Sequence, residues 1–428
     1  MYLKRGWIKG VQLFCQLLYY TEDFGVIFMT HTLIVGIDIG KRTHVATIID
    51  EAGNVVARPF SFANTTTGGT LLLDRIAVVN TDTSKVVFGL EATGHYWLAL
   101  FSFLTGKGYP VSVINPYQSD AFRKVHLSTT KTDKEDSYLI ADLLRFGSFQ
   151  ETKMADEQMV SLRNLTRFRV TMSQKITDTK RRTVTIMDQI FPEFETLFSN
   201  SFGKTAKALL EDYPTPDSFE SITTRKLTNF LTKLSKGRFK KEKADEIKQK
   251  ASASFGIDFA LDSFTLELSL LLKQLDFLGV QITVVEKQIE QLMESVPTTL
   301  KTLPGVDTIL AAAILSEIGD IHRFQTSAQL VSFAGINPTV HQSGQFTGNK
   351  NHMSKKGSPY LRLALWKASI TSVRFNPVLK AYYKQKTKEG KNHMTVIGAV
   401  SRKLTGIIFA MMRDSKEFTE SPSGTRLR

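Results

Sequence analysis

The sequence has little cysteine and no long apolar run. Its single cysteine, Cys15, excludes an internal disulfide framework and any cysteine-rich zinc site. No stretch of about 18 consecutive apolar residues occurs, so we predict that no segment spans a membrane. Acidic residues are in deficit, because 41 Asp and Glu stand against 55 Lys and Arg, a net charge of +14. Such a basic excess favours nucleic acid as a partner ahead of an anionic membrane; a merely basic soluble protein is the plain alternative.

The first 28 residues do not follow the pattern of a folded domain. Lys4 and Arg5 precede a semi-apolar stretch over residues 11–20 that loosely suggests a signal peptide, but no small-residue cleavage site follows. Met29 stands just ahead of the first strand pattern. We therefore expect translation to start at Met29, and residues 1–30 to be an extension that is either not native or disordered.

A buried strand carries the first candidate site residue. Residues 33–37 form a continuous, mostly β-branched apolar run that ends near Gly40, which predicts a strand rather than a helix. Asp38 follows this run, where an unpaired buried carboxylate costs several kcal/mol. A divalent metal ion would compensate the charge. The alternative is an Asp that caps the strand end in a turn before Gly40.

The order of elements over residues 31–150 predicts an α/β domain. We expect strands over 33–37, 43–50, 55–62, 85–90 and 110–114, and helices over 66–79, 94–105 and 133–145. Three antiparallel strands followed by parallel α/β units is the order of the ribonuclease-H-like fold. In that fold the first and fourth strands are neighbours, so Asp38 and Glu91 would meet outside the carboxyl ends of the strands, where α/β sheets have their sites.

Two further acids begin the next helix. Asp133 and Asp136 are three residues apart, so one helix face presents both, whereas Glu135 points elsewhere. An acidic first turn that complements the helix dipole is the alternative for this pair. With Asp38 and Glu91 they form a set of hard oxygen ligands suited to Mg²⁺ or Mn²⁺. Two such ions about 4 Å apart can activate a nucleophile and stabilise the leaving oxygen of a phosphodiester.

The middle of the chain, residues 151–264, is predicted to be a basic helical region. Helical stretches over 162–170 and 175–182 are rich in arginine and lysine, and Pro192 ends them. Their basic face, and a second basic cluster over 236–243, would contact phosphates or simply face solvent. The same two alternatives hold for the basic residues close in sequence to the acidic set, which are Arg123, Lys124, Lys131 and Lys134.

A regular apolar pattern follows over residues 265–296. Its members step alternately by three and four residues: Leu268, Leu271, Leu275, Leu278, Ile282, Val285, Ile289 and Leu292. A pattern sustained for more than three heptads is typical of a coiled coil or a long two-helix packing. We expect it to join two copies of the chain, with a hairpin inside one chain as the alternative.

Residues 297–413 are predicted to form a mainly helical last domain, followed by a disordered tail over 414–428. Leu303-Pro-Gly-Val306 before a helix over 308–318 is similar to a helix-hairpin-helix, whose turn exposes backbone N–H groups to phosphate. A polar, glycine-punctuated loop then carries Ser343, which from this pattern alone is an ordinary loop serine. Two more helices are expected, over 360–373 and 393–413.

Together these stretches resemble the bacterial insertion-sequence transposases with a DEDD set of carboxylates, the IS110 family, to which the Piv-type DNA invertases are related. The matching segments are Gly36-Ile-Asp-Ile-Gly-Lys41, Leu90-Glu-Ala-Thr-Gly-His-Tyr96, Lys131-Thr-Asp-Lys-Glu-Asp136, Leu303-Pro-Gly-Val306, Ser343-Gly344 and Ser354-Lys-Lys-Gly-Ser-Pro-Tyr-Leu-Arg362. The resemblance runs from about residue 31 to residue 413. It has two departures: the N-terminal extension, and Ser137 where a small alanine is usual after Asp136.

The resemblance implies a RuvC-like N-terminal domain, a coiled coil and a C-terminal transposase domain with a serine. Carried over to this chain, the metal ligands are Asp38, Glu91, Asp133 and Asp136, and the serine is Ser343, with Ser354 as second choice. The implied cofactor is Mg²⁺, and the implied partners are DNA at the element's ends and target and a structured RNA that guides their pairing. The family also implies a homo-oligomer, a dimer that becomes a tetramer on DNA, in the cytoplasm and at the nucleoid.

We therefore expect a transposase in which the acids bind Mg²⁺ and Ser343 attacks phosphorus to form a phosphoserine link. Acids of one subunit and the serine of another would make a composite site. A RuvC-like endonuclease that uses water is one alternative, and it would not need Ser343. A sugar-kinase-like or actin-like ATPase would share Gly36–Gly40 but needs a second glycine-rich Asp strand, and none follows residue 150. A non-enzymatic nucleic-acid scaffold is the third alternative.

Overall fold

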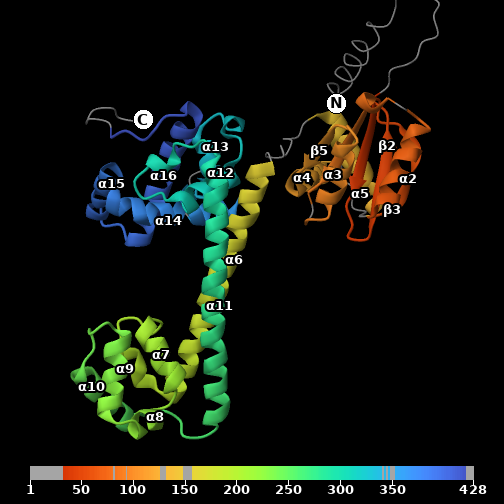
Figure 1. The fold of residues 1–428 in the computed structure, drawn as a ribbon. Coiled ribbons are helices and arrows are strands. Elements are labelled where there is room, and N and C mark those ends of the chain that lie inside the picture. Colours follow the sequence, from red (N-terminus) through yellow and green to blue (C-terminus); the bar gives the residue numbers. More distant parts are fainter. Residues whose placement is uncertain are drawn as a thin grey trace, which may run out of the picture. The chain divides into compact units, whose positions relative to one another are not determined.

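The computed structural model describes residues 32–80, 82–92, 94–125, 132–147, 157–339, 342–343, 346–347 and 352–420. They form two compact units, with the boundary between residues 154 and 155 (Figure 1). The extension predicted over residues 1–30 lies outside the described residues, as does the last part of the predicted tail, residues 421–428. The domain boundary predicted near residue 150 also falls in a segment that is not described, residues 148–156.

The first unit is built on a mixed five-stranded sheet. Its strands are β1 (Leu33–Asp38), β2 (Thr43–Ile49), β3 (Val55–Ala63), β4 (Val86–Glu91) and β5 (Val111–Ile114). Their order across the sheet is β3-β2-β1-β4-β5. The first three are antiparallel neighbours, whereas β1, β4 and β5 run parallel. The predicted α/β class of this unit is confirmed, and each predicted strand is present.

Helices pack on both faces of this sheet. They are α2 (Thr66–Ala77), α3 (Trp97–Gly106), α4 (Pro116–Val125) and α5 (Asp133–Phe146), with a short 3-10 turn η1 (Thr83–Lys85). Alternate residues of β1 point to opposite faces, as a strand requires. Val35 and Ile37 belong to the core shared with α2 and α3, whereas Ile34 packs with Ala141 of α5. Because both faces are covered, β1 is apolar along its whole length up to Asp38.

The second unit is organised around two helices of 34 residues each, α6 (Glu157–Ile190) and α11 (Leu261–Glu294). They lie side by side (Figure 1). Gln158 donates to the carbonyl of Leu292 near one end, and Arg182 pairs with Glu267 towards the other. The two helices are therefore antiparallel. The buried stripe of α11 packs against α6 of the same chain, which matches the intramolecular alternative for the apolar pattern.

Each end of this hairpin carries a helical core. Between α6 and α11 lie η2 (Pro192–Leu197), α7 (Lys204–Asp212), α8 (Pro216–Ser221), α9 (Thr224–Leu234) and α10 (Lys241–Ser252). After α11 follow η3 (Leu300–Thr302), α12 (Thr308–Ile318), η4 (Ile321–Arg323), α13 (Ser327–Phe333), β6 (Gln342–Ser343), β7 (Phe346–Thr347), α14 (Pro359–Phe375), α15 (Pro377–Lys388) and α16 (His393–Asp414). The mainly helical C-terminal region is thus confirmed.

Two helices of this unit are long and apolar, although neither contains an unbroken run of about 18 apolar residues. By length and composition alone, α11 and α16 could cross a membrane. Within the fold, however, α16 contributes Val396, Val400, Leu404 and Ile408 to the core, and α11 buries one face against α6. Core helices of globular proteins have the same composition, so these two helices are weak evidence for a membrane.

Candidate active site

Strands β1 and β4 bring the first two acids together. The strands are parallel neighbours, with Ile37 opposite Leu90, and each ends in a carboxylate one residue later, Asp38 and Glu91. Both strands are held by buried apolar residues, so their ends are fixed by the core of the sheet. The predicted neighbourhood of Asp38 and Glu91 at the carboxyl ends of the strands is therefore present.

Helix α5 brings the other two acids to the same edge. Its N-cap is Thr132, whose hydroxyl accepts from the N–H of Glu135, and its first turn contains Asp133 and Asp136. Asp136 is buried, whereas Asp133 and Glu135 are exposed. The helix can lie this close to the sheet because β1 has a glycine at position 36. A Cβ there would lie 2.2 Å from the carbonyl oxygen of Ser137, the residue after Asp136.

The four carboxylates form one electrostatic group. The pKa of Asp38 is raised to about 6. Burial is the largest cause, and the negative charges of Asp136, Asp133 and Glu91 are the others. Like charges brought together disfavour ionisation, and a site with a shifted pKa of this origin is a candidate functional site. The other three acids predicted from the sequence, one on β4 and two on α5, therefore all act on Asp38 of β1.

Helix α4, which the sequence analysis did not predict, supplies partners to two of these acids. The hydroxyl of Ser119 donates to Oε2 of Glu91 at 2.9 Å. Nη1 of Arg123 lies 2.6 Å from Oδ1 of Asp136. Asn115 and Pro116 could have indicated a helix start, because the Asn side chain accepts from the N–H of Tyr117 and proline favours the first turn. Nothing in the local sequence singles out Ser119.

The donor chemistry of this set suits a divalent metal ion, but its arrangement here is incomplete. Four carboxylates offer the hard oxygen atoms that Mg²⁺ and Mn²⁺ prefer. Over the part of the chain that the structure describes, however, no three His, Cys, Asp or Glu side chains are grouped closely enough to hold a metal ion. One of the four, Asp136, is paired with Arg123 instead.

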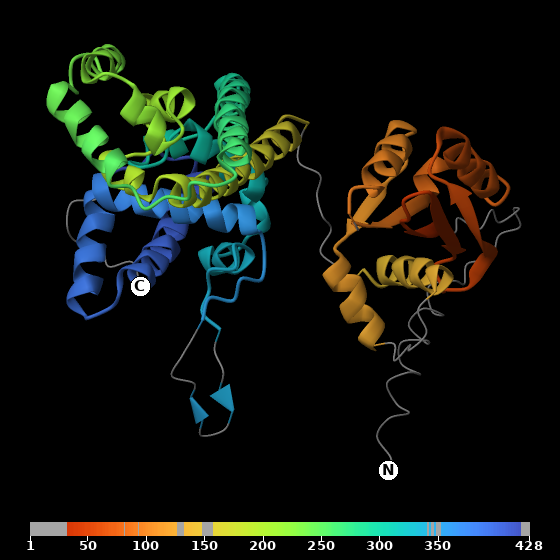
Figure 2. The same cartoon turned by 90° about the horizontal axis from the view of Figure 1, so that it is seen from below.

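The two candidate serines lie in the second unit and differ in what the structure describes. The backbone of Ser343 belongs to β6, which pairs with β7 in a short antiparallel ladder, Ser343 opposite Phe346 (Figure 2). Its side chain lies outside the described part. Ser354 donates its hydroxyl to Oδ1 of Asn337 at 2.5 Å, and its N–H to the carbonyl of the same residue at 2.9 Å. Ser354 therefore helps to close the base of the loop that carries Ser343.

Two family models match this chain over the regions that contain these residues. Residues 35–192 match a transposase model, DEDD_Tnp_IS110, and residues 298–384 match the Transposase IS116/IS110/IS902 family. The chain belongs to the IS110 family of transposases. The first match includes Asp38, Glu91, Asp133 and Asp136, and the second includes both Ser343 and Ser354. The protein is therefore a DNA transposase or recombinase.

Full-length relatives agree with this transposase assignment. The chain is 25% identical over 417 residues to the uncharacterized 43.6 kDa protein of insertion element IS110 from Streptomyces coelicolor, covering 96% of this chain and 100% of the relative. It is 24% identical over 403 residues to the 44.8 kDa protein of insertion element IS116 from Streptomyces clavuligerus, covering 92% and 97%. It is also 25% identical over 391 residues to the pilin gene-inverting protein of Moraxella bovis, covering 90% and 97%.

The turn before α12 differs from the predicted phosphate-binding turn of this transposase. The N–H of Val306 donates to the carbonyl of Leu303, and Asp307 caps α12 by accepting from the N–H of Leu310. Gly305 has a φ of +97° and abuts α14, where a Cβ would lie 2.6 Å from Cα of Ser372. The N–H of Val306 is therefore not available to phosphate, and the prediction for the rest of the Leu303–Val306 turn stays a prediction.

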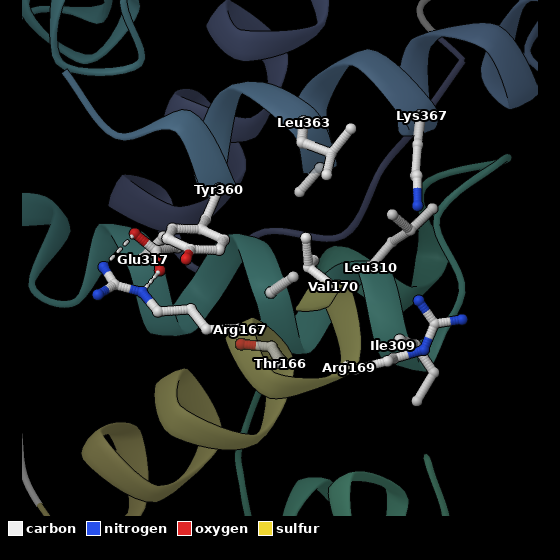
Figure 3. A pocket seen from close by; sticks show the side chains of 12 residues that line it. Thr166, Arg167, Arg169, Val170, Ile309, Leu310, Glu317, Tyr360, Leu363 and Lys367 are labelled. Carbon is white, nitrogen blue, oxygen red and sulfur yellow. Dashed lines mark hydrogen bonds and ion pairs between the residues drawn. The ribbon is translucent and has the colours of Figure 1, made fainter. Parts of the chain in front are cut away.

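A pocket of the second unit lies between α6, α12 and α14 and holds none of the predicted acids (Figure 3). At one end Arg167 pairs with Glu317 beside Tyr360, and at the other Arg169 and Lys367 meet. Burial, and then the charge of Arg169, lower the pKa of Lys367. Most of the pocket lining is apolar, and its charged residues are three bases and one acid, in contrast to the acidic edge of the first unit.

Several basic residues predicted to contact phosphate or solvent are engaged within the protein. On α6, Arg181 pairs with Asp178, and Arg182 pairs with Glu267 of α11. Lys243 of the predicted 236–243 cluster pairs with Glu246 and lies over the ring of Phe198. These contacts are mostly at the surface, where an ion pair is exchanged for phosphate at little cost. They leave both alternatives for these residues open.

Proposed function

We propose that this transposase is RNA-guided and uses a RuvC-like domain with Mg²⁺ (or Mn²⁺) and a serine nucleophile to cut and rejoin DNA. The observation that carries the proposal is the convergence of Asp133, Asp136 and Glu91 on Asp38. Burial and then these three neighbouring acids raise the pKa of Asp38, and a carboxylate in such surroundings is a candidate ligand for a cation. The order of the sheet, three antiparallel strands followed by two parallel ones, supports the ribonuclease-H-like class for the first unit.

The metal ion would be held by Asp38, Glu91, Asp133 and Asp136. When bound, it would polarise the scissile phosphate and stabilise the developing charge on the leaving oxygen. The protein's part is to hold these ligands at one edge of the sheet, on β1, β4 and α5. With a pKa of about 6, Asp38 is mostly a carboxylate at neutral pH, and protons would compete with the metal ion below that pH.

Ser343 is the proposed nucleophile. Its Oγ forms a bond to phosphorus, the bond from phosphorus to a deoxyribose oxygen breaks, and the serine proton passes to that departing oxygen. Attack by a different deoxyribose hydroxyl reverses the step, releases the serine and rejoins the strand without loss of the phosphodiester bond energy. Ser354 is the second choice, since its hydroxyl would first have to leave Asn337.

The acids and the serine belong to different units, and we propose that two subunits combine them in one composite site. Mixing Asp38→Ala subunits with Ser343→Ala subunits tests this arrangement. Activity should return in the mixture, because some of its sites then combine an intact acidic set with an intact serine. A mixture that stays as inactive as each variant alone would contradict the composite site.

The guide RNA and the DNA are the proposed polyanionic partners. The net charge of +14 suits binding of both, and pairing by the RNA would supply the sequence specificity that the protein itself need not carry. In this proposal the protein works in the cytoplasm and at the nucleoid.

Recombination of the element's ends with a target, with and without the flanking RNA, tests the proposed function. Asp38→Ala and Ser343→Ala should each lower the rate of recombination by about 10³-fold or more, since the acids and the serine act together in one reaction. Omission of the RNA should abolish recombination. DNA cleavage that survives Ser343→Ala would favour a water-using endonuclease, and full activity after Asp38→Asn would favour a scaffold without catalysis.

Self-association through α11 is a further part of the proposal. The stripe predicted to join two copies is covered by α6, but an opposite stripe of α11 is apolar and exposed: Leu266, Leu270, Phe277, Val280 and Val284. We propose that this stripe contacts a second copy. Phe277→Asp with Val280→Asp should shift the protein to monomer in sedimentation experiments, whereas Lys273→Asp, in the same stripe, should have a smaller effect. An unchanged assembly would show that another surface joins the subunits.

A further inference from the structure

Two side chains on one face of α4 contact carboxylates of the acidic set. Ser119 and Arg123 are four residues apart, so they lie one above the other on the same side of the helix. Ser119 is only 2% exposed and donates to Glu91, while Arg123 pairs with Asp136. The side chains of Arg123 and Asp136 are 19% and 12% exposed. This ion pair is therefore largely shielded from water, where the attraction between charges is stronger than at the surface.

Arg123 and a metal ion require the same carboxylate. The guanidinium lies 2.6 Å from Oδ1 of Asp136, so it occupies the space from which a cation would approach that oxygen. The guanidinium carries a single positive charge, whereas the group has four carboxylates. The group as a whole therefore still attracts a divalent cation.

We propose that Arg123 is the counter-ion of the acidic set before metal binding, that the metal ion displaces it from Asp136, and that the released guanidinium binds a phosphate of the DNA. The inference rests on the proposed metal-dependent function. Since α4 is also tied to Glu91 through Ser119, the released side chain would remain beside the site. A guanidinium binds phosphate with the same planar fork that binds carboxylate, so it can exchange one partner for the other.

Binding of Mn²⁺ to the full chain, measured by calorimetry without nucleic acid, tests the first part. Arg123→Gln and Arg123→Met should each bind Mn²⁺ about tenfold more tightly than the wild type, because the competing cation is gone. Lys124→Gln is the matched control. Lys124 is the next residue of α4, pairs with Asp120 in an exposed position, and should leave Mn²⁺ affinity unchanged.

Binding of a DNA duplex that carries an element end, measured with Mn²⁺ present, tests the second part. Both Arg123 variants should bind the duplex about tenfold more weakly, and the slope of log affinity against log salt should fall by about one contact. Replacement of a residue that merely supports the fold would weaken the binding of both Mn²⁺ and DNA. Tighter metal binding together with weaker DNA binding is the signature of the exchange.

The outcomes separate this inference from the function on which it rests. If the wild type binds Mn²⁺, Asp38→Ala abolishes that binding, and neither Arg123 variant binds more tightly, the role of Arg123 is overturned while the metal site stands. Weaker Mn²⁺ binding by Arg123→Met, which keeps the apolar stem in place, would overturn it equally. If the wild type binds no Mn²⁺, or binds it as well after Asp38→Ala, the metal-dependent function itself fails.

Discussion

Each unit contains an ion pair whose acid is buried, and the surroundings of the two pairs carry opposite surpluses of charge. In the first, Asp136 pairs with Arg123, and three further carboxylates lie near. In the second, Glu317, 4% exposed, pairs with Arg167, and two further arginines lie near, Arg163 and Arg323. Burial lowers the pKa of Arg163 and of Arg323, and the charge of a neighbouring arginine lowers each pKa further.

The difference lies in how the surplus is compensated. Glu317 accepts two hydrogen bonds from Arg167 and one from the hydroxyl of Ser358. Arg163 donates to the carbonyl of Ser316 at the end of α12, and Arg323 lies over the ring of Phe333 at 4.4 Å. The surplus arginines thus have partners within the fold. In the first unit Glu91 also has a partner, Ser119, but the charges of Asp136, Asp133 and Glu91 all act on Asp38, and this repulsion suits a site that has to bind a cation.

Removal of Arg167 should have the largest effect on stability. Arg167→Ala leaves Glu317 buried with Ser358 as its remaining hydrogen-bond donor, and the loss should be about 3 kcal/mol in the free energy of unfolding. Arg181→Ala on the same helix is the control, since its pair with Asp178 is exposed and should matter by less than about 0.5 kcal/mol. Urea unfolding measures both. Equal effects would show that the Glu317 pair is not a structural anchor.

Replacement of Asp38 should act in the opposite direction. In the folded protein the pKa of Asp38 is about 6, above its ordinary value of 3.8, so the folded state holds the proton more firmly than the unfolded state. The contribution of Asp38 to the free energy of unfolding therefore falls as the pH rises from about 4 to 6. Asp38→Asn removes that loss. In the presence of EDTA the variant should be more stable than the wild type by about 1 kcal/mol at pH 7, a value reduced because the side chain is partly exposed.

The pH dependence provides the control for this prediction. The advantage of Asp38→Asn should disappear at pH 4, where the folded protein carries the proton on Asp38. Unfolding by urea at pH 4, 5 and 7 measures the difference at each pH. A variant that is less stable than the wild type at pH 7 would show that the acidic set stabilises the first unit rather than straining it.

An effect of similar size is expected at Ser137, the residue after Asp136 in α5. The Ser137 hydroxyl is buried, donates to the carbonyl of Lys134 and is 2.7 Å from the hydroxyl of Thr47 on β2. Ser137→Ala should cost about 1 kcal/mol, because Thr47 loses its partner. The double variant with Thr47→Val should recover part of that loss in the same urea experiment. A double variant that is worse than the sum of both changes would contradict this pairing.

Much of the first unit was predictable because its signals are local. The apolar run before Asp38 predicted β1, and the rule that parallel strands end at one edge predicted the meeting with Glu91. The acidic first turn of α5 was equally clear. Helix α4 was missed, since it is short and mostly polar, and the partners of its Ser119 and Arg123 lie in other elements.

The second unit was predictable in its long helices but not in their partners. The period of the apolar residues predicted α11, yet an apolar stripe fits another chain or the same chain equally well, and here α6 covers it. The pair between Arg167 and Glu317 joins residues 150 positions apart. No local pattern distinguishes such an arginine from its exposed neighbours on α6.

The hairpin of α6 and α11 also sets a length. A helix of 34 residues rises about 51 Å, and the two helical cores lie along opposite ends of this hairpin (Figure 1). A DNA duplex of about 15 base pairs is equally long. A straight nucleic acid laid along the whole hairpin would therefore make about one and a half helical turns, so that it would present opposite sides of its axis at the two ends.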